Sequence, residues 1–195
     1  DKIILYNASI DVKTPKVKEK EREYLTIEEV RQLEKKECRY EVLKRAFLFS
    51  CLTGLRWSDI HKLKWKEVHI SEKGSRIHYY QKKTENLEYL DINEQALPYL
   101  GEKGKDEDKP FEGLKYSSYF NVALTQWMLK ASITKHITFH CARHTHATLL
   151  LENGVDIYTV SKLLGHKEIK TTQVYARIID RTKKEAVNKI PNIKL

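Results

Sequence analysis

The chain has 195 residues, of which 41% are hydrophobic and 32% are charged, a composition that suits one globular domain and argues against wholesale disorder. Its 36 Lys and Arg residues outnumber its 27 Asp and Glu residues, and the net charge of +9 favours a polyanionic partner, of which nucleic acid is the commonest. Three widely separated cysteines without a CxxC pair indicate neither a disulfide framework nor a cysteine zinc site, and no apolar run approaches the roughly 18 residues of a membrane span.

Residues 1–24 have the composition of a connector, because basic and acidic residues alternate there and no helical stripe of apolar residues appears. The first helix is predicted to begin at Thr26. The segment Thr26-Ile27-Glu28-Glu29 is a capping box, in which the threonine and glutamate side chains each bond a backbone N–H that has no partner inside the helix. A second helix is predicted over Tyr40–Thr53, with Gly54 as its left-handed stop.

The apolar pattern then changes from a helical to an alternating period. Short strands are predicted at Val68–Ile70, Ile77–Gln81 and Leu87–Ile92, separated by turns that contain Gly74 and residues 83–86. We expect these strands to form a small antiparallel sheet. Residues 101–110 are rich in Gly, Lys and Asp and are predicted to form a loop.

Helical patterns return in the second half of the chain. Helices are predicted at Ser118–Lys130, Thr138–Glu152, Asp156–Leu164, Thr171–Arg177 and Thr182–Lys189, with Gly154 and Gly165 at two of the helix ends. The predicted fold class is therefore mainly α with a small three-stranded antiparallel β-sheet. Two apolar sets are expected to face the core: Val42, Leu43, Ala46, Phe47 and Phe49, and later Val122, Trp127, Met128 and Leu129.

Two arginines, Arg56 and Arg143, are candidates for holding a phosphate group. A phosphodiester that is cut without a metal needs fixed cations on its non-bridging oxygens, and a guanidinium group supplies two parallel N–H donors. His140 and Arg143 are three residues apart at the start of a predicted helix, which places both on one face near the positive end of the helix dipole. Asp59, three residues after Arg56, is a candidate to orient this guanidinium or a histidine.

Tyr175 is the candidate nucleophile. A tyrosine hydroxyl with its ordinary pKa of about 10 stays protonated at neutral pH, so it needs a base or strong electrostatic help. His140 and His166 titrate in the right range for this task, and His166 follows a glycine that is expected to expose its ring at a helix end. The leaving oxygen needs a proton, which Lys83, in the turn between two predicted strands, is a candidate to supply.

These residues stand in an order that resembles the signature of the tyrosine recombinase (phage integrase) family. The resemblance lies in Thr138–Thr148, Leu163–His166 and Thr172–Tyr175, while Thr53–Arg56 is similar to the family's first arginine box and Lys83 matches its β-hairpin lysine. It covers about residues 24 to 185. His146 departs from the pattern, since many relatives carry an aromatic residue at that position.

The resemblance implies a site-specific DNA recombinase like the integrases of bacterial mobile elements. Tyrosine attacks a DNA phosphate, a 3′-phosphotyrosine bond forms, a 5′-hydroxyl is released, and a partner strand reverses the step. The implied roles are phosphate binding and activation for Arg56, His140, Arg143 and His166, general acid catalysis for Lys83 or its neighbour Lys82, nucleophilic attack for Tyr175, and support for Asp59. No metal or other cofactor is implied, because the phosphotyrosine bond keeps the energy of the broken linkage.

The same resemblance implies three parts: a connector over residues 1–24, a catalytic domain over residues 25–185, and a C-terminal tail over residues 186–195 that docks onto a neighbouring protomer. The implied partners are double-stranded DNA, further copies of the chain in a dimer or tetramer on that DNA, and accessory proteins that bend DNA or set the direction of recombination. The implied location is the cytoplasm, at the nucleoid when DNA is bound. Integration or excision of a mobile element is the expected outcome, but inversion and dimer resolution use the same residues.

Three other interpretations lead to different classes of protein. His136, His140 and His144 follow a helical spacing, as metal ligands can, but no acidic cluster and no HExxH motif accompany them. Residues 149–163 have the helix, glycine turn and helix of a DNA-binding regulator, which would have no use for the arginines, histidines and tyrosine in this order. A type IB topoisomerase would share the chemistry, but the compact early hairpin and the closely spaced second half favour a recombinase.

Overall fold

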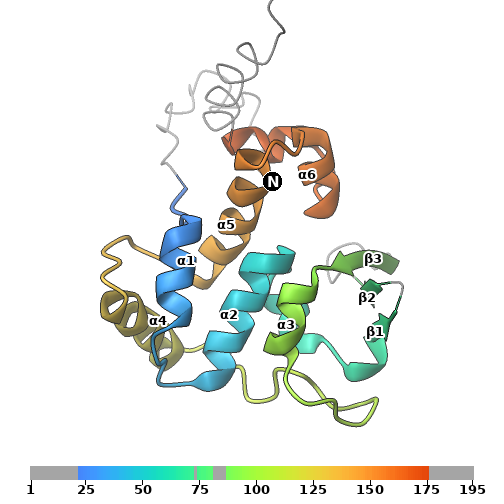
Figure 1. Ribbon diagram of the computed structural model, residues 1–195, viewed down its shortest axis with the longest axis horizontal. Helices are drawn as coiled ribbons and strands as arrows, with labels where there is room; N and C mark the ends of the chain where they lie inside the picture. Colours follow the sequence, from blue (N-terminus) through green and yellow to red (C-terminus); the bar gives the residue numbers. More distant parts are fainter. Residues whose placement is uncertain (1–21, 73, 81–86, 176–195) are drawn as a thin grey trace, which may run out of the picture.

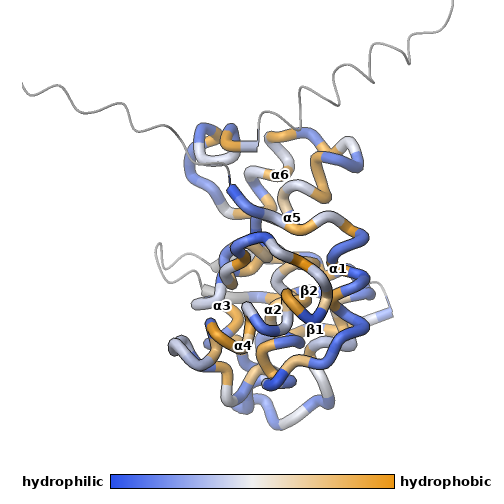
Figure 2. Tube along the Cα trace, turned by 90° about the vertical axis from the view of Figure 1, so that its left-hand side faces the viewer, coloured by the Kyte–Doolittle hydropathy of each residue, from blue (hydrophilic) through white to orange (hydrophobic). Residues whose placement is uncertain are grey.

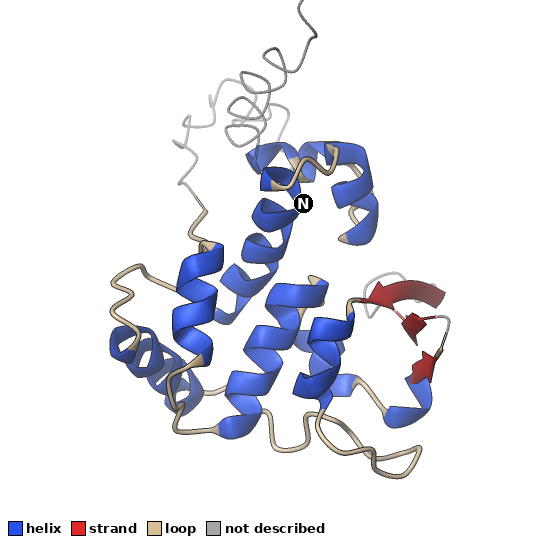
Figure 3. Ribbon diagram, viewed as in Figure 1, coloured by secondary structure: helices blue, strands red, loops and turns tan. Residues whose placement is uncertain are grey.

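The structure, a computed structural model, describes residues 22–72, 74–80 and 87–175, which form a mainly helical body with a small sheet at one side (Figures 1 and 3). Its α-helices are α1 (Ile27–Glu34), α2 (Glu41–Thr53), α3 (Trp57–Lys62), α4 (Ser118–Lys130), α5 (Phe139–Glu152) and α6 (Ile157–Leu163). Its strands are β1 (Val68–Ser71), β2 (Gly74–Tyr80) and β3 (Leu87–Ile92), and its short 3₁₀ helices are η1 (Trp65–Glu67), η2 (Glu94–Leu100), η3 (Ile169–Thr171) and η4 (Gln173–Tyr175). This architecture confirms the predicted fold class.

The predicted capping box at the start of α1 is present. The Thr26 hydroxyl accepts a hydrogen bond of 3.2 Å from the Glu29 N–H, and the Glu29 carboxylate accepts one of 2.7 Å from the Thr26 N–H. Leu25, just before the cap, is fully buried, and its N–H donates to Thr145 Oγ1 on α5 at 2.9 Å. The start of α1 is therefore attached to the helix that carries the candidate site.

The central helix is α2, which lies between α1 and the sheet (Figure 1). Every residue from Ala46 to Cys51 is buried, as expected for a helix with neighbours on all sides. Gly54 ends it in the predicted left-handed conformation, with φ of +70° and its N–H bonded to the Ser50 carbonyl at 2.8 Å.

The sheet has the order β1-β2-β3 and is antiparallel throughout. Val68, Ile77 and Leu90 stand side by side in the register and are buried, which attaches this face of the sheet to the core. The β2 strand begins at Gly74, three residues before the predicted start at Ile77, because it continues to pair with β1 up to Ser71.

Helix α4 buries a single stripe of residues, Phe120, Ala123, Leu124, Trp127 and Met128, at the 3.6-residue period of an amphipathic helix. Val122 and Leu129 fall off this stripe and are 53% and 59% exposed, so their predicted place in the core was wrong. In the first apolar set Leu43, Ala46, Phe47 and Phe49 are buried as predicted, while Val42 is only partly buried against the core.

Helix α5 runs from the main body to a smaller upper part that it forms with α6 and the turns after it (Figure 2). Its first turn packs in the main core through residues such as Phe139 and Ala142. Its second half packs in a separate small cluster made of Ala147, Leu151, Val160, Leu164 and Tyr175. The candidate nucleophile thus belongs to a small packing unit that is distinct from the main core.

The region after α6 differs from its prediction. Residues 169–175 form two short 3₁₀ helices, η3 and η4, where an α-helix over Thr171–Arg177 was predicted. The predicted helix over Thr182–Lys189 lies outside the described residues, as do the segment 1–21 and the tail 186–195. Helix α3 and the 3₁₀ helices η1 and η2 were not predicted. Helix α3 has six residues and η1 has three, which is too short for a clear helical period, and η2 contains Pro98.

Candidate active site

Arg143 joins three segments of the candidate site. Its side chain is buried on α5, its Nη1 donates to the Gly54 carbonyl at 2.7 Å, and its Nη2 donates to the Leu164 carbonyl at the end of α6. These carbonyl bonds fix the guanidinium group between the turn after α2 and the end of α6. The turn after α2 carries Arg56, and the segment after α6 carries His166, so the predicted residues come together around this one side chain.

Arg56 lies at the N-terminus of α3 and is partly exposed, with a side-chain exposure of 35%. Its Nη1 is 4.0 Å from Oδ2 of Asp59, whose side chain is only 6% exposed. This Asp59 oxygen is the one buried side-chain polar atom in the described residues that lacks a hydrogen-bond partner. Burial raises the pKa of Asp59, while the charge of Arg56 lowers it by a smaller amount. The Asp59 carboxylate therefore lies next to the Arg56 guanidinium, one of the two partners considered for it, and its supporting role stays a prediction.

The two predicted histidines lie close to both arginines. His166 is partly buried, its backbone N–H bonds the Ser161 carbonyl at 3.0 Å, and its Nδ1 is 2.8 Å from Thr172 Oγ1. Burial, followed by the charges of Arg143 and Arg56, lowers the pKa of His166 to about 4. The pKa of His140 is also lowered, first by desolvation and then by Arg143. Both rings are therefore uncharged at neutral pH while no anion is bound.

Tyr175 is buried, with 5% of its surface exposed, and its hydroxyl contacts Nδ1 of His144. Burial raises the pKa of Tyr175 to about 12, so the phenol keeps its proton at neutral pH. Burial and then the charge of His140 lower the pKa of His144 to about 4. The His144 ring in turn packs edge-on against the His140 ring, with centroids 4.6 Å apart.

Some site residues differ from the sequence-based prediction. His144 was considered only as a metal ligand, and its contact with Tyr175 was missed, because the two residues lie 31 positions apart in different elements. The only signal in the sequence was its place directly after Arg143. His146 bonds the Cys51 carbonyl through Nδ1 at 3.2 Å and supports the turn after α2. Lys83 and Lys82 lie outside the described residues, so their place at the site stays a prediction.

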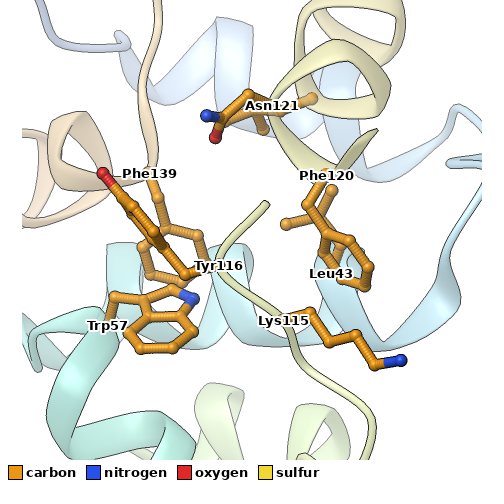
Figure 4. Close-up of a pocket in the computed structure, with 8 residues that line it drawn as sticks. Leu43, Trp57, Lys115, Tyr116, Phe120, Asn121 and Phe139 are labelled. Carbon is orange, nitrogen blue, oxygen red and sulfur yellow. The ribbon is translucent and has the colours of Figure 1, made fainter. Parts of the chain in front are cut away.

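A shallow pocket is lined by residues of α2, α3, α4 and α5 and of the segment before α4 (Figure 4). It is open to solvent and is lined by Leu43, Trp57, Lys115, Tyr116, Phe120, Asn121, Leu124 and Phe139. Trp57 and Tyr116 lie together on one side, opposite Leu43 and Lys115. Two of its lining residues are sequence neighbours of site candidates, since Trp57 follows Arg56 and Phe139 precedes His140.

Within the described residues, no group of three or more His, Cys, Asp or Glu side chains is arranged to hold a metal ion. No helix in the same residues is long and apolar enough to span a membrane.

This arrangement of a central α-helix, a lateral three-stranded sheet and a buried tyrosine after α6 has the fold of a tyrosine recombinase catalytic domain. The catalytic domain of bacteriophage HP1 integrase superposes with a TM-score of 0.60 at 25% identity, covering 86% of this chain and 95% of that domain. The chain belongs to the phage integrase family, whose model matches residues 23–181.

Curated relatives agree with this assignment. A tyrosine recombinase of Pseudothermotoga lettingae is 28% identical over 187 residues, which cover 92% of this chain and 64% of that protein. The tyrosine recombinase XerA of Saccharolobus solfataricus is 31% identical over 176 residues, which cover 89% of this chain and 58% of that protein. The chain therefore spans less than two thirds of the length of these two relatives.

Proposed function

We propose that the chain is the catalytic domain of a site-specific DNA recombinase that cuts and rejoins DNA strands through a 3′-phosphotyrosine intermediate. The observation that carries the proposal is the Arg143 side chain, which holds the Arg56 turn and the His166 segment against α5, the helix whose His144 contacts Tyr175. Family membership and the names of the relatives support the same reaction.

The proposed chemistry divides between charge stabilisation and proton transfer. Arg56 and Arg143 bind the non-bridging oxygens of the attacked phosphate, where guanidinium N–H donors are most effective in a site with little water. His140 and His166 add donors to the same oxygens. Tyr175 forms the bond to phosphorus, and Lys83 gives a proton to the leaving 5′-oxygen. Nothing in this sequence of steps requires a metal or a cofactor.

The proposed substrate is duplex DNA, in agreement with the net charge of +9. Strand exchange needs at least two cut strands, so we propose that copies of the chain act as a dimer or tetramer on DNA. The tail 186–195 is proposed to dock onto a neighbouring protomer, and deleting it should weaken the cooperativity of assembly. By resemblance to the family, the proposal includes accessory proteins that bend DNA or set the direction of recombination. It also includes the integration or excision of a mobile element as the outcome.

The test is the capture of a covalent protein–DNA adduct on a denaturing gel. Wild-type chain and Tyr175→Phe are incubated with supercoiled plasmid and with a pool of nicked duplexes of randomised sequence, in the presence of EDTA. We expect an adduct with wild type and none with Tyr175→Phe, while a gel shift shows equal DNA binding by both. The Phe variant removes only the hydroxyl, so the comparison isolates the nucleophile.

Each other outcome identifies a different function. An adduct that persists in Tyr175→Phe means that another residue is the nucleophile. DNA binding by both proteins without any adduct favours a regulator that binds DNA without cutting it. The third outcome is tested on a supercoiled plasmid that carries two copies of the site selected from the pool. Relaxation of this plasmid without any recombinant product indicates a type IB topoisomerase.

A further inference from the structure

His144 holds the hydroxyl of the candidate nucleophile. Within the described part of the chain, its Nδ1 is the acceptor available to the Tyr175 hydroxyl. Both residues are buried, with 8% and 5% of their surfaces exposed, and their ring centroids are 5.7 Å apart at an angle of 61°. The phenol keeps its proton at neutral pH and the imidazole is uncharged. In the tautomer with its proton on Nε2, Nδ1 of His144 accepts the hydrogen bond that the Tyr175 hydroxyl donates.

The two histidines predicted from the sequence are placed differently. Nδ1 of His166 is paired with Thr172 Oγ1 at 2.8 Å. The ring of His140 is exposed and meets the edge of the His144 ring, so His144 stands between His140 and Tyr175. A general base must lie within hydrogen-bond distance of the proton that it removes, and His144 is the histidine with a hydrogen-bond contact to the phenol.

We propose that His144 is a catalytic residue whose Nδ1 takes the proton of the Tyr175 hydroxyl as the phenol oxygen attacks the DNA phosphate. The proposal rests on the proposed function, since it names the base of the same reaction. In the free protein the same contact keeps the hydroxyl protonated and buried, so His144 also holds the nucleophile in its resting state.

The proton and the electron pairs balance in both directions. In cleavage, an oxygen lone pair of Tyr175 forms the bond to phosphorus, the phenol proton moves to Nδ1 of His144, and the bond from phosphorus to the 5′-oxygen breaks. The 5′-oxygen takes a proton from the general acid and leaves as a hydroxyl. In rejoining, the 5′-hydroxyl gives its proton back to the general acid as its oxygen attacks phosphorus, the bond from phosphorus to the tyrosine oxygen breaks, and His144 returns its proton to that oxygen.

The charges around His144 link this step to substrate binding. The groups that face it are His140 and Arg143 on α5, Arg22 from the segment before α1, His166 after α6, and Tyr175 itself. In the free protein the positive charges of Arg143 and Arg22 oppose a charged His144 ring. A bound phosphate offsets them and favours the imidazolium, and the phenol becomes acidic as its bond to phosphorus forms. Proton transfer is therefore promoted when the phosphate is in place.

The experiment compares His144→Asn with His144→Ala in single-turnover cleavage of a nicked duplex. The asparagine amide oxygen can accept a hydrogen bond from the Tyr175 hydroxyl but takes up no proton near neutral pH, whereas alanine does neither. We expect both variants to form the covalent adduct about 100-fold more slowly than wild type or worse, as for loss of a general base. His136→Gln, a change at an exposed histidine outside the site, is the matched control and should cleave at the wild-type rate.

A second substrate separates the base from the acid. A duplex with sulfur in place of the bridging 5′-oxygen has a leaving group that departs without protonation. We expect the defect of His144→Asn to remain on this duplex and the defect of Lys83→Ala to disappear. The rate of wild type should rise with pH as the base loses its proton and then level off, and His144→Asn should lack this rise.

Three results would overturn the proposal. Near wild-type cleavage by His144→Asn with slow cleavage by His144→Ala would show that His144 only holds the hydroxyl. If the sulfur duplex restores cleavage by His144→Asn, His144 is the acid that protonates the leaving group and not the base. Wild-type rates in both variants would exclude any role. Absence of an adduct with wild type itself would instead contradict the proposed function. Circular dichroism of each variant identifies misfolding. If a variant is misfolded, the comparison is repeated with His144→Gln.

Discussion

Arg143 donates a hydrogen bond of 2.7 Å from Nη1 to the main-chain carbonyl of Gly54, which joins α5 to the turn after α2 across 89 positions of sequence. A buried guanidinium group bonded to main-chain carbonyls is held more firmly than one bonded to mobile side chains, because the carbonyls belong to the ends of two helices. The position of Arg56, two residues after Gly54, therefore depends on the conformation of this glycine.

Replacing Gly54 by alanine should destabilise the protein. Its φ of +70° is costly for a residue with a side chain, and an added Cβ would lie 2.7 Å from His146 Cδ2 and 3.0 Å from Leu164 Cδ2. We expect Gly54→Ala to lower the free energy of unfolding by roughly 2–4 kcal/mol, as the sum of backbone strain and overpacking. Urea denaturation followed by circular dichroism measures this change.

Gly154→Ala is the matched control for that measurement. Gly154 has a similar φ of +83°, but an added Cβ there meets no atom within 4 Å, so only the backbone strain of about 1 kcal/mol should appear. Equal losses in the two variants would show that His146 and Leu164 yield easily to a larger residue, and would remove the argument that Gly54 is required by close packing.

The stability of the fold should fall between pH 6.5 and pH 5. The pKa values of His144, His146 and His166 are lowered to about 4, in each case mainly by burial. In this range the unfolded chain binds protons at histidines that the folded chain leaves uncharged, so acid favours unfolding. Each such proton lowers the free energy of unfolding by about 1.4 kcal/mol per pH unit. Denaturation with urea at pH 7, 6 and 5 measures the slope.

His146→Gln identifies one contributor to this slope. The variant should be less stable than wild type at pH 7, because the ring packs against Gly54, but its stability should depend less on pH. His136→Gln, at an exposed position, should keep the wild-type slope. A slope in His146→Gln as steep as that of wild type would mean that His146 is already charged in the folded state.

The main helices and their ends could be predicted because their signals are local. Thr26 and Glu29 form their capping box within four residues, and Gly54 ends α2 through its own φ. The exposure of Val122 could not be read from composition, since it depends on which side of α4 faces the core. The same limit applies to α3, whose six residues are positioned by packing of the buried Ile60 rather than by their own helical period.

The residue types of the site were visible in the sequence, but their arrangement was not. A sequence motif indicates which residues belong to the site, namely Arg56, His140, Arg143 and Tyr175. The burial of Tyr175 and its contact with His144 arise from the small cluster between the end of α5 and the turns after α6. Such contacts between elements far apart in sequence depend on packing, which no local pattern encodes.

Asp59→Asn should separate stability from activity. The Asp59 carboxylate is buried with one oxygen unbonded, and burial raises its pKa. The folded chain therefore holds the Asp59 proton more tightly than the unfolded chain, and ionisation of this group lowers stability as the pH rises. We expect Asp59→Asn to be at least as stable as wild type at pH 7 and to form the DNA adduct at least about 10-fold more slowly, because Arg56 loses its charged neighbour.

The adduct assay and urea denaturation, run on the same preparation, test both halves of this prediction. A loss of stability greater than about 1 kcal/mol in Asp59→Asn would show that the ionised carboxylate stabilises the fold through its pairing with Arg56. Asp91→Asn is a suitable control, since Asp91 pairs with Arg76 on the exposed face of the sheet at 2.6 Å and lies outside the site.

Binding of DNA should be accompanied by the uptake of protons. His140 and His166 have lowered pKa values in the free protein, partly because Arg143 and Arg56 are close to them. A phosphate placed between these arginines offsets their charge and raises both pKa values, so the complex binds protons that the free protein does not. Affinity should therefore increase as the pH is lowered from 7 towards 5.5. Titration calorimetry in two buffers with different heats of ionisation measures the number of protons.

His166→Gln should take up fewer protons than wild type on the same DNA, while His136→Gln should match wild type. Because DNA phosphates stay charged in this pH range, the difference between the two variants reports the histidine alone. Equal uptake by wild type and His166→Gln would mean that the phosphate does not come near His166, and the two arginines would then have to bind the DNA without help from this end of α6.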